Sequence, residues 1–184
     1  MSFLMSVLAS SMAVASSMTG VTCDGTAVHG RFESAAGGGT YQAVTFDAKA
    51  VPAGSRVVVL ESTHRDGTEI ELRLHGLQPD RTFGAHVHQK PCGTKPADSG
   101  AHYQDVVDPK QPSSDPEYAN PDNEVWLDFT TDGRGNGSAT SSVDFFFRAG
   151  EARSVVIHEH ATETGPGHAG MAGARLACVN VPFG

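Results

Sequence analysis

Two histidines that lie one residue apart give this chain its first candidate for chemistry. His86 and His88 are in the segment "GAHVHQ". On a β-strand, residues i and i+2 share a face, so both imidazoles would point the same way and offer half of a metal site. His158 and His160 repeat this spacing after an apolar run, and His102 lies in "SGAHYQ". Grouped imidazoles suit copper or zinc, and their spacing alone does not choose between the two metals.

Short strands separated by turns would have to position these histidines. The segment 68–77 alternates apolar with charged residues, which is typical of a half-buried antiparallel strand. We expect eight strands, at 40–48, 55–63, 68–77, 82–89, 124–132, 137–147, 153–160 and 175–181. The sequence therefore predicts an all-β sandwich or barrel, with a long loop over 90–123 that begins and ends beside the histidine strands.

The charge balance excludes one class of partner. The chain has 184 residues, 13 of them Lys or Arg and 21 Asp or Glu, so its formal net charge is −8. Proteins that bind nucleic acid need a basic surface, and we therefore expect no nucleic-acid partner. An anionic substrate would need a local positive group at its site. The length is sufficient for one domain with a substantial core.

The N-terminal segment indicates export. Residues 1–22 are mildly apolar and rich in Ser and Ala, which suggests a signal peptide, although no Lys or Arg precedes Arg31. The apolar part is too short to be a stable membrane span. Cys23 would then be removed, left unpaired or used as a lipid anchor. We expect a Gly-rich linker over 23–39, a domain over 40–184, and an extracytoplasmic location, secreted, periplasmic or attached to the cell surface.

Four segments together resemble the copper–zinc superoxide dismutase family, in its bacterial secreted form. The segments are "GAHVH", "SGAHYQ", "VVIHEH" and "GMAGARLACV", and their order along the chain is the specific part of the match. The resemblance covers residues 40 to 182. It implies an eight-stranded Greek-key β-barrel with long loops, which agrees with the strands expected above.

The resemblance also implies a set of copper ligands. They would be His86, His88, His102 and His158, with His102 as the histidine that bridges the metals in the family. His158 is preferred to His160 because the family's ligand directly follows the apolar run.

The resemblance also implies roles in the reaction and a disulfide. Arg175 would hold superoxide near the copper, and His102 would carry a proton during the reaction. Cys92 and Cys178 would form the family's disulfide, which ties the long loop to the last strand.

The chain departs from the family at the zinc site. The family's zinc site uses the bridging histidine, two more loop histidines and an aspartate, whereas no histidine lies between His102 and His158 here. The acids left in this part of the chain are Asp105, Asp108, Asp115, Glu117, Asp122 and Glu124. Carboxylates with one imidazole form a poor structural zinc site. We therefore expect a copper-only variant. The other nitrogen of His102 would be held by water or a carboxylate, with Asp105 as the candidate acid.

The expected function is superoxide dismutation, giving oxygen and hydrogen peroxide at a histidine-bound copper. One alternative is a non-catalytic copper-binding protein of the same fold, although Arg175 favours the enzyme. A carbohydrate-binding module is a weaker alternative, because Trp126 is the only tryptophan and lies in an expected strand. The sequence does not indicate the oligomeric state.

Overall fold

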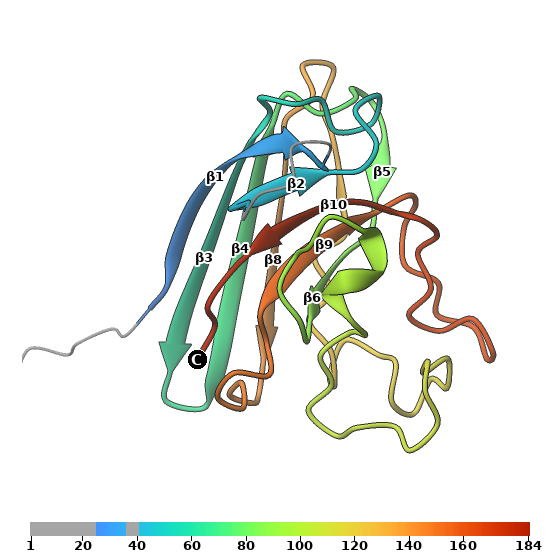
Figure 1. The fold of residues 1–184 in the computed structure, drawn as a ribbon. Helices are drawn as coiled ribbons and strands as arrows, with labels where there is room; N and C mark the ends of the chain where they lie inside the picture. Colours follow the sequence, from blue (N-terminus) through green and yellow to red (C-terminus); the bar gives the residue numbers. More distant parts are fainter. Residues whose placement is uncertain (1–24, 36–40) are drawn as a thin grey trace, which may run out of the picture.

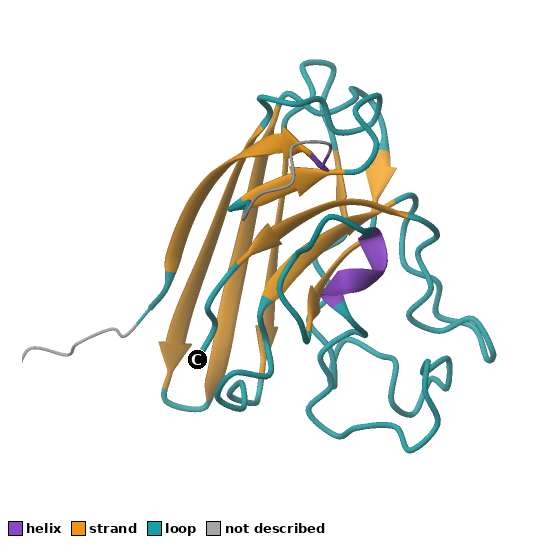
Figure 2. Ribbon diagram, in the orientation of Figure 1, coloured by secondary structure: helices purple, strands orange, loops and turns teal. Residues whose placement is uncertain are grey.

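The computed structural model describes residues 25–35 and 41–184, nearly all of them in strands and loops (Figure 2). The predicted signal peptide and Cys23 lie outside these residues. The elements are β1 (Ala27–Ser34), β2 (Ala43–Thr45), β3 (Arg56–His64), β4 (Gly67–His75), β5 (Thr82–Phe83), β6 (Ala85–His88), η2 (Pro96–Ser99), β7 (Phe129–Thr130), β8 (Gly137–Val143), β9 (Ser154–His158) and β10 (Arg175–Asn180). In the described part of the chain, no helix has the length and apolar character to cross a membrane.

Eight strands form one sheet in the order β6-β9-β10-β2-β1-β3-β4-β8. β1 and β2 are parallel, and the other neighbours in this sheet are antiparallel. The sheet curls, so that β9 and β10 cross in front of the long strands β4 and β8 (Figure 1). The predicted all-β, eight-stranded barrel fold is confirmed.

The apolar core lies between the two halves of the curled sheet. Ile70, Leu72 and Leu74 of β4 are fully buried, as their alternation with charged residues predicts. Val87 of β6 and Ile157 of β9 belong to the same core cluster. Because side chains alternate between the two faces of a strand, the neighbours of Val87 and Ile157 must point out of the barrel.

The linker predicted over 23–39 is wrong for Ala27–Ser34, which form β1. This strand pairs with β3 over Ala27–Arg31 and with β2 over Phe32–Ser34. Phe32 is buried in the core, and Val28 packs against it on the same side of the strand. The two apolar residues with period-2 spacing were the available signal, and the small residues around them concealed it. The sheet therefore begins before residue 40.

Two other expected strands are shorter than the sequence predicts. The segment 82–89 is divided at Gly84 into β5 and β6, and only Phe129–Thr130 of 124–132 is a strand. The rest of 124–132 runs alongside β6 through a single bridge between Trp126 and His86. Backbone groups in this stretch bond to loops as well as strands, which interrupts the regular ladder.

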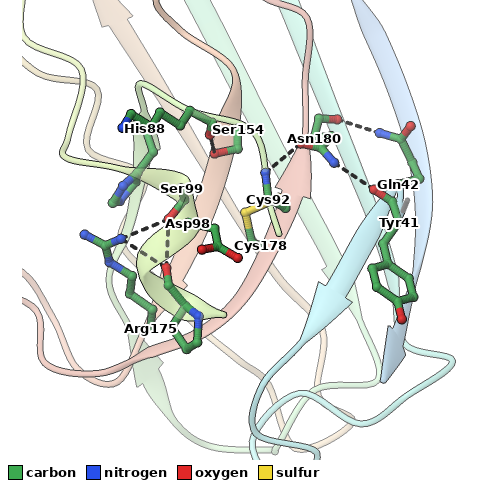
Figure 3. The surroundings of a disulfide bond; sticks show 12 residues. Tyr41, Gln42, His88, Cys92, Asp98, Ser99, Ser154, Arg175, Cys178 and Asn180 are labelled. Carbon is green, nitrogen blue, oxygen red and sulfur yellow. Dashed lines mark hydrogen bonds between the residues drawn. A yellow bond between two sulfur atoms is a disulfide. The ribbon is translucent and has the colours of Figure 1, made fainter. Parts of the chain in front are cut away.

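A disulfide fixes the start of the long loop to the sheet. Cys92 is bonded to Cys178 of β10 across 86 residues of sequence, so the predicted pairing is confirmed. The Cys92 N–H also donates to the side-chain oxygen of Asn180 at 2.8 Å, and the Asn180 amide donates to the Tyr41 carbonyl at 2.7 Å (Figure 3). The link holds η2, which follows Cys92, against the beginning of β10, as Figure 3 shows.

Replacing both Cys92 and Cys178 by Ser is expected to lower the free energy of unfolding by about 2–5 kcal/mol, because the unfolded chain regains the freedom of a long loop. Denaturant unfolding of the variant and of the wild type measures the difference. Wild-type protein unfolded in a reducing agent is the matched control and is expected to follow the double variant. Equal stability of oxidised wild type and double variant would contradict the role given to the link.

Candidate metal centre

Four histidines converge on the outer face of the barrel. His86 and His88 come from β6, His158 is the last residue of β9, and His102 comes from the long loop. β6 and β9 are paired, and His102 reaches the group through a single bridge to His88. One ligand atom from each of the four rings lies within 4.8 Å of all the others. The structure therefore brings together every histidine that the sequence predicts as a ligand.

The structure places His160 outside this group. Its ring is exposed, and its Nδ1 bonds to the Ala161 carbonyl at 2.9 Å. His160 shares the strand spacing with His158, but β9 ends at His158 and the chain turns away. This separation agrees with the preference for His158 over His160.

Three of the four rings are oriented by a bond at Nδ1. The Nδ1–H of His88 donates to the Gly100 carbonyl at 3.1 Å, and that of His158 to the Gly173 carbonyl at 3.4 Å. The Nδ1 of His102 lies 2.8 Å from a Glu124 carboxylate oxygen. Each acceptor is an oxygen that cannot donate, so the proton sits on Nδ1 and the lone pair of Nε2 is free.

His86 is oriented in the opposite sense. Its Nε2 bonds to the hydroxyl of Thr162 at 2.7 Å, so its Nδ1 is the nitrogen that faces the cluster. That Nδ1 is fully buried and has no hydrogen-bond partner among the described residues. A buried polar atom without a partner is costly, and a metal ion would satisfy it. A donor set of four imidazole nitrogens suits copper or zinc, so the residues present fit a metal of the kind that the family resemblance implies.

Burial keeps His86, His88 and His158 in the neutral form that a metal requires. It lowers the pKa of His86 and of His88 well below the usual value, and the neighbouring His102 ring lowers both further. Burial also lowers the pKa of His158 to about 3. A neutral imidazole has a lone pair to give, so these three histidines do not have to lose protons at neutral pH before they bind a metal.

Glu124 is the hydrogen-bond partner of His102, and the expectation of Asp105 in this role is wrong. Asp105 points elsewhere, with its carboxylate 3.7 Å from the guanidinium of Arg148. Glu124 is 1% exposed, and its Oε2 also accepts the indole N–H of Trp126 at 2.8 Å. In the sequence, Glu124 is one of six acids in this part of the chain, and only the path of the loop singles it out.

Gln104 completes the surroundings of the Glu124 carboxylate. Its side-chain oxygen accepts from the Asp108 N–H and from the Gln111 amide, so its Nε2 faces Glu124 Oε1 at 2.8 Å. Glu124 therefore receives three N–H donors, from His102, Trp126 and Gln104. This arrangement fixes the position of His102 without a second metal ion, because its Nδ1 is already occupied.

The remaining acids do not gather around His102. Asp108 is buried but accepts from the Ser113 hydroxyl and the Lys110 N–H. The other three, Asp115, Glu117 and Asp122, are exposed. In residues 25–35 and 41–184, the four histidines are the only group of three or more His, Cys, Asp or Glu that is arranged to bind a metal.

A cavity of about 490 Å³ leads to the histidines from solvent. His102, His158 and Arg175 line it, and Arg175 is the single Lys or Arg among the described lining residues. The Arg175 guanidinium donates to the Ser99 hydroxyl at 3.0 Å and to the Pro96 carbonyl at 3.1 Å, both in η2 (Figure 3). Burial lowers the pKa of Arg175, but a guanidinium stays protonated near neutral pH. A fixed positive charge therefore lies where a small anion would enter.

The sequence matches the family described as copper/zinc superoxide dismutase over residues 54–181, and the chain belongs to that family. Among solved structures, the copper/zinc superoxide dismutase of Brucella abortus is 20% identical, with a TM-score of 0.55 over 86% of this chain and 99% of that one. A superoxide dismutase-like protein from Bacillus subtilis is 16% identical, with a TM-score of 0.53 over 77% and 98%. A double mutant of the same kind of protein gives 18% and 0.55 over 71% and 92%. No curated protein matched the chain in sequence.

Replacing Glu124 by Gln is expected to weaken copper binding by about 10–100-fold, as loss of a ligand's hydrogen-bond partner typically does. Both carboxylate oxygens of Glu124 accept N–H groups. In the Gln variant, the side-chain NH₂ would occupy one of these positions and would face an N–H donor, so that hydrogen bond would be lost. The dissociation constant of Cu(II), measured by competition with a chelator, tests this. Glu117→Gln changes an exposed carboxylate in the same loop and is expected to bind copper as the wild type does. Equal affinities for all three proteins would contradict the role of Glu124.

Proposed function

We propose that this protein is a superoxide dismutase that works with copper alone and acts outside the cytoplasm. The observation that carries the proposal is the convergence of four imidazoles beside the cation of Arg175, in a cavity open to solvent. The family match supports the reaction class. The reaction consumes two superoxide anions and two protons and gives one oxygen and one hydrogen peroxide.

The protein's own residues would bind the anion and move the proton. Copper, when bound by His86, His88, His102 and His158, supplies a one-electron redox couple. Arg175 attracts superoxide and orients it toward the histidines. Its bonds to η2 hold the guanidinium, and with it the positive charge, in one position. The Nδ1–H of His102 donates to the Glu124 carboxylate, so Nε2 is the atom of this ring that would take up and release a proton.

The choice of copper rests on the donor set. Four imidazoles without a thiolate or carboxylate in the inner group suit a copper redox site. The Glu124 carboxylate already binds the second nitrogen of His102, which is the nitrogen that a bridging histidine would give to zinc. We therefore propose that zinc is dispensable here.

The proposed location rests on the disulfide. Links such as Cys92–Cys178 form and persist in oxidising surroundings and are rare in the cytosol. A lipid anchor at Cys23 and the oligomeric state are left to experiment.

A second candidate is a copper-binding protein of the same fold without turnover. The four histidines would serve such a protein equally well, and two of the structures similar to this chain are named only as superoxide dismutase-like. The two candidates differ in turnover and not in metal binding, so both quantities have to be measured on the same sample.

Oxidised protein loaded with one copper and freed of zinc is expected to dismutate superoxide, because Glu124 already fixes His102. Pulse radiolysis or a cytochrome c competition assay gives the rate, and metal analysis of the same sample gives its copper and zinc content. Addition of zinc is expected to leave the rate unchanged. A sample with full copper content and no turnover would favour the copper-binding candidate.

Replacing Arg175 by Ala is expected to lower the second-order rate constant about tenfold or more, since a local positive charge raises the concentration of an anionic substrate. The variant is expected still to bind copper, because Arg175 bonds to η2 and is not one of the four ligands, and loss of its positive charge does not oppose a cation. Arg134→Ala removes an exposed arginine from a distant hairpin and is the matched control. If Arg175→Ala matched the wild-type rate, Arg175 would have no part in the reaction.

A further inference from the structure

The outward-facing nitrogen of His86 is bound in a way that differs from the other three ligands. Its partner is the hydroxyl of Thr162, at 2.7 Å, and not a backbone carbonyl or a carboxylate. The same hydroxyl donates to Asp128 Oδ1 at 2.7 Å. A carboxylate only accepts, so the Thr162 proton points to Asp128 and its oxygen accepts the Nε2–H of His86. The direction of both bonds is therefore determined by Asp128.

Asp128 binds Thr162 at a second point and also contacts β6. Its Oδ2 accepts the Thr162 backbone N–H at 2.6 Å, and its Oδ1 accepts the Ala85 N–H at 3.3 Å. The carboxylate therefore connects the strand that bears His86 to the loop between β9 and β10. That loop also supplies Gly170–Ala174, which form one wall of the cavity.

Gly84 allows the loop to approach this closely. A Cβ atom at this position would lie 2.6 Å from the His160 carbonyl oxygen, 2.8 Å from the Ala172 Cβ and 3.3 Å from the Thr162 hydroxyl. Two of these distances are shorter than real Cβ contacts, so any side chain at residue 84 would push the loop away. Gly84, Asp128 and the loop that bears Thr162 therefore together bring the Thr162 hydroxyl to His86.

We propose that Thr162 and Asp128 are positioning residues for the metal centre. They select the form of His86 in which Nδ1 is unprotonated and aimed at the other three ligand atoms. Without the hydroxyl, the Nε2–H of the fully buried His86 ring would have no acceptor. A buried donor without an acceptor costs free energy, so the present orientation and tautomer of the ring would lose their advantage over the alternatives. The inference rests on the proposed copper site, but it does not depend on turnover.

Thr162→Val keeps the branched shape and removes the hydroxyl, and it is expected to weaken Cu(II) binding about 10–100-fold. Its Cu(II) electron paramagnetic resonance spectrum is expected to differ from the wild-type spectrum, because the orientation of one ligand is no longer fixed. Thr162→Ser keeps the hydroxyl and is expected to restore both the affinity and the spectrum. Asp128→Asn is also expected to weaken Cu(II) binding and to alter the spectrum. Its NH₂ group would face either the hydroxyl or the backbone N–H of Thr162, both of which donate to Asp128.

Thr164→Val is the matched control, because Thr164 is an exposed threonine in the same loop. It is expected to leave the affinity and the spectrum unchanged. If Thr162→Val bound copper with wild-type affinity and a wild-type spectrum, the inference would be wrong even though the copper site stood. The same conclusion would follow if Thr162→Val lowered only the thermal stability of the metal-free protein. Failure of the wild type to bind copper at these histidines would overturn the proposed function and this inference together.

Discussion

The pairing register of β6 with β9 is the constraint on which the metal centre depends. His86 lies opposite Val156, and the His158 N–H bonds to the Gly84 carbonyl, so the three histidines of these strands share the outer face. Val87 and Ile157 share the inner face and belong to the core. A slip of one residue would turn histidines into the core and valines into the site. Burial of the apolar side chains therefore sets the geometry of the ligands.

The segment 124–128 extends this control beyond the strands. Its two carboxylates, Glu124 and Asp128, lie on either side of Trp126, whose backbone forms a bridge with His86. Glu124 orients His102 directly, and Asp128 orients His86 through Thr162. Two ligands from different parts of the chain are thus fixed from one short stretch. These hydrogen bonds hold the imidazole rings of His86 and His102 in place within the protein itself.

The parts of the site that the sequence predicts are those whose residues lie in one strand or in a short recognisable segment. His86 and His88 are recognisable because a strand alternates its faces, and the disulfide and His158 follow from segments that resemble the family. Glu124 could not be chosen over Asp105, because nearness to His102 depends on how a long loop folds back. Thr162 has no local signature, since its role arises from contacts with segments 34 and 76 residues away. The strand β1 was missed because glycine and alanine dilute a pattern of only two apolar residues.

The place of β1 in the sheet has a practical consequence for where the folded unit begins. Within the described residues, β1 lies between β2 and β3 and joins a four-stranded part of the sheet, β6-β9-β10-β2, to a three-stranded part, β3-β4-β8. A shortened protein that started at residue 40 would expose an unpaired edge on each part. Open edges of this kind invite pairing with other molecules. Recombinant forms made for metal loading therefore need to retain Ala27–Ser34 to keep the eight-stranded sheet continuous.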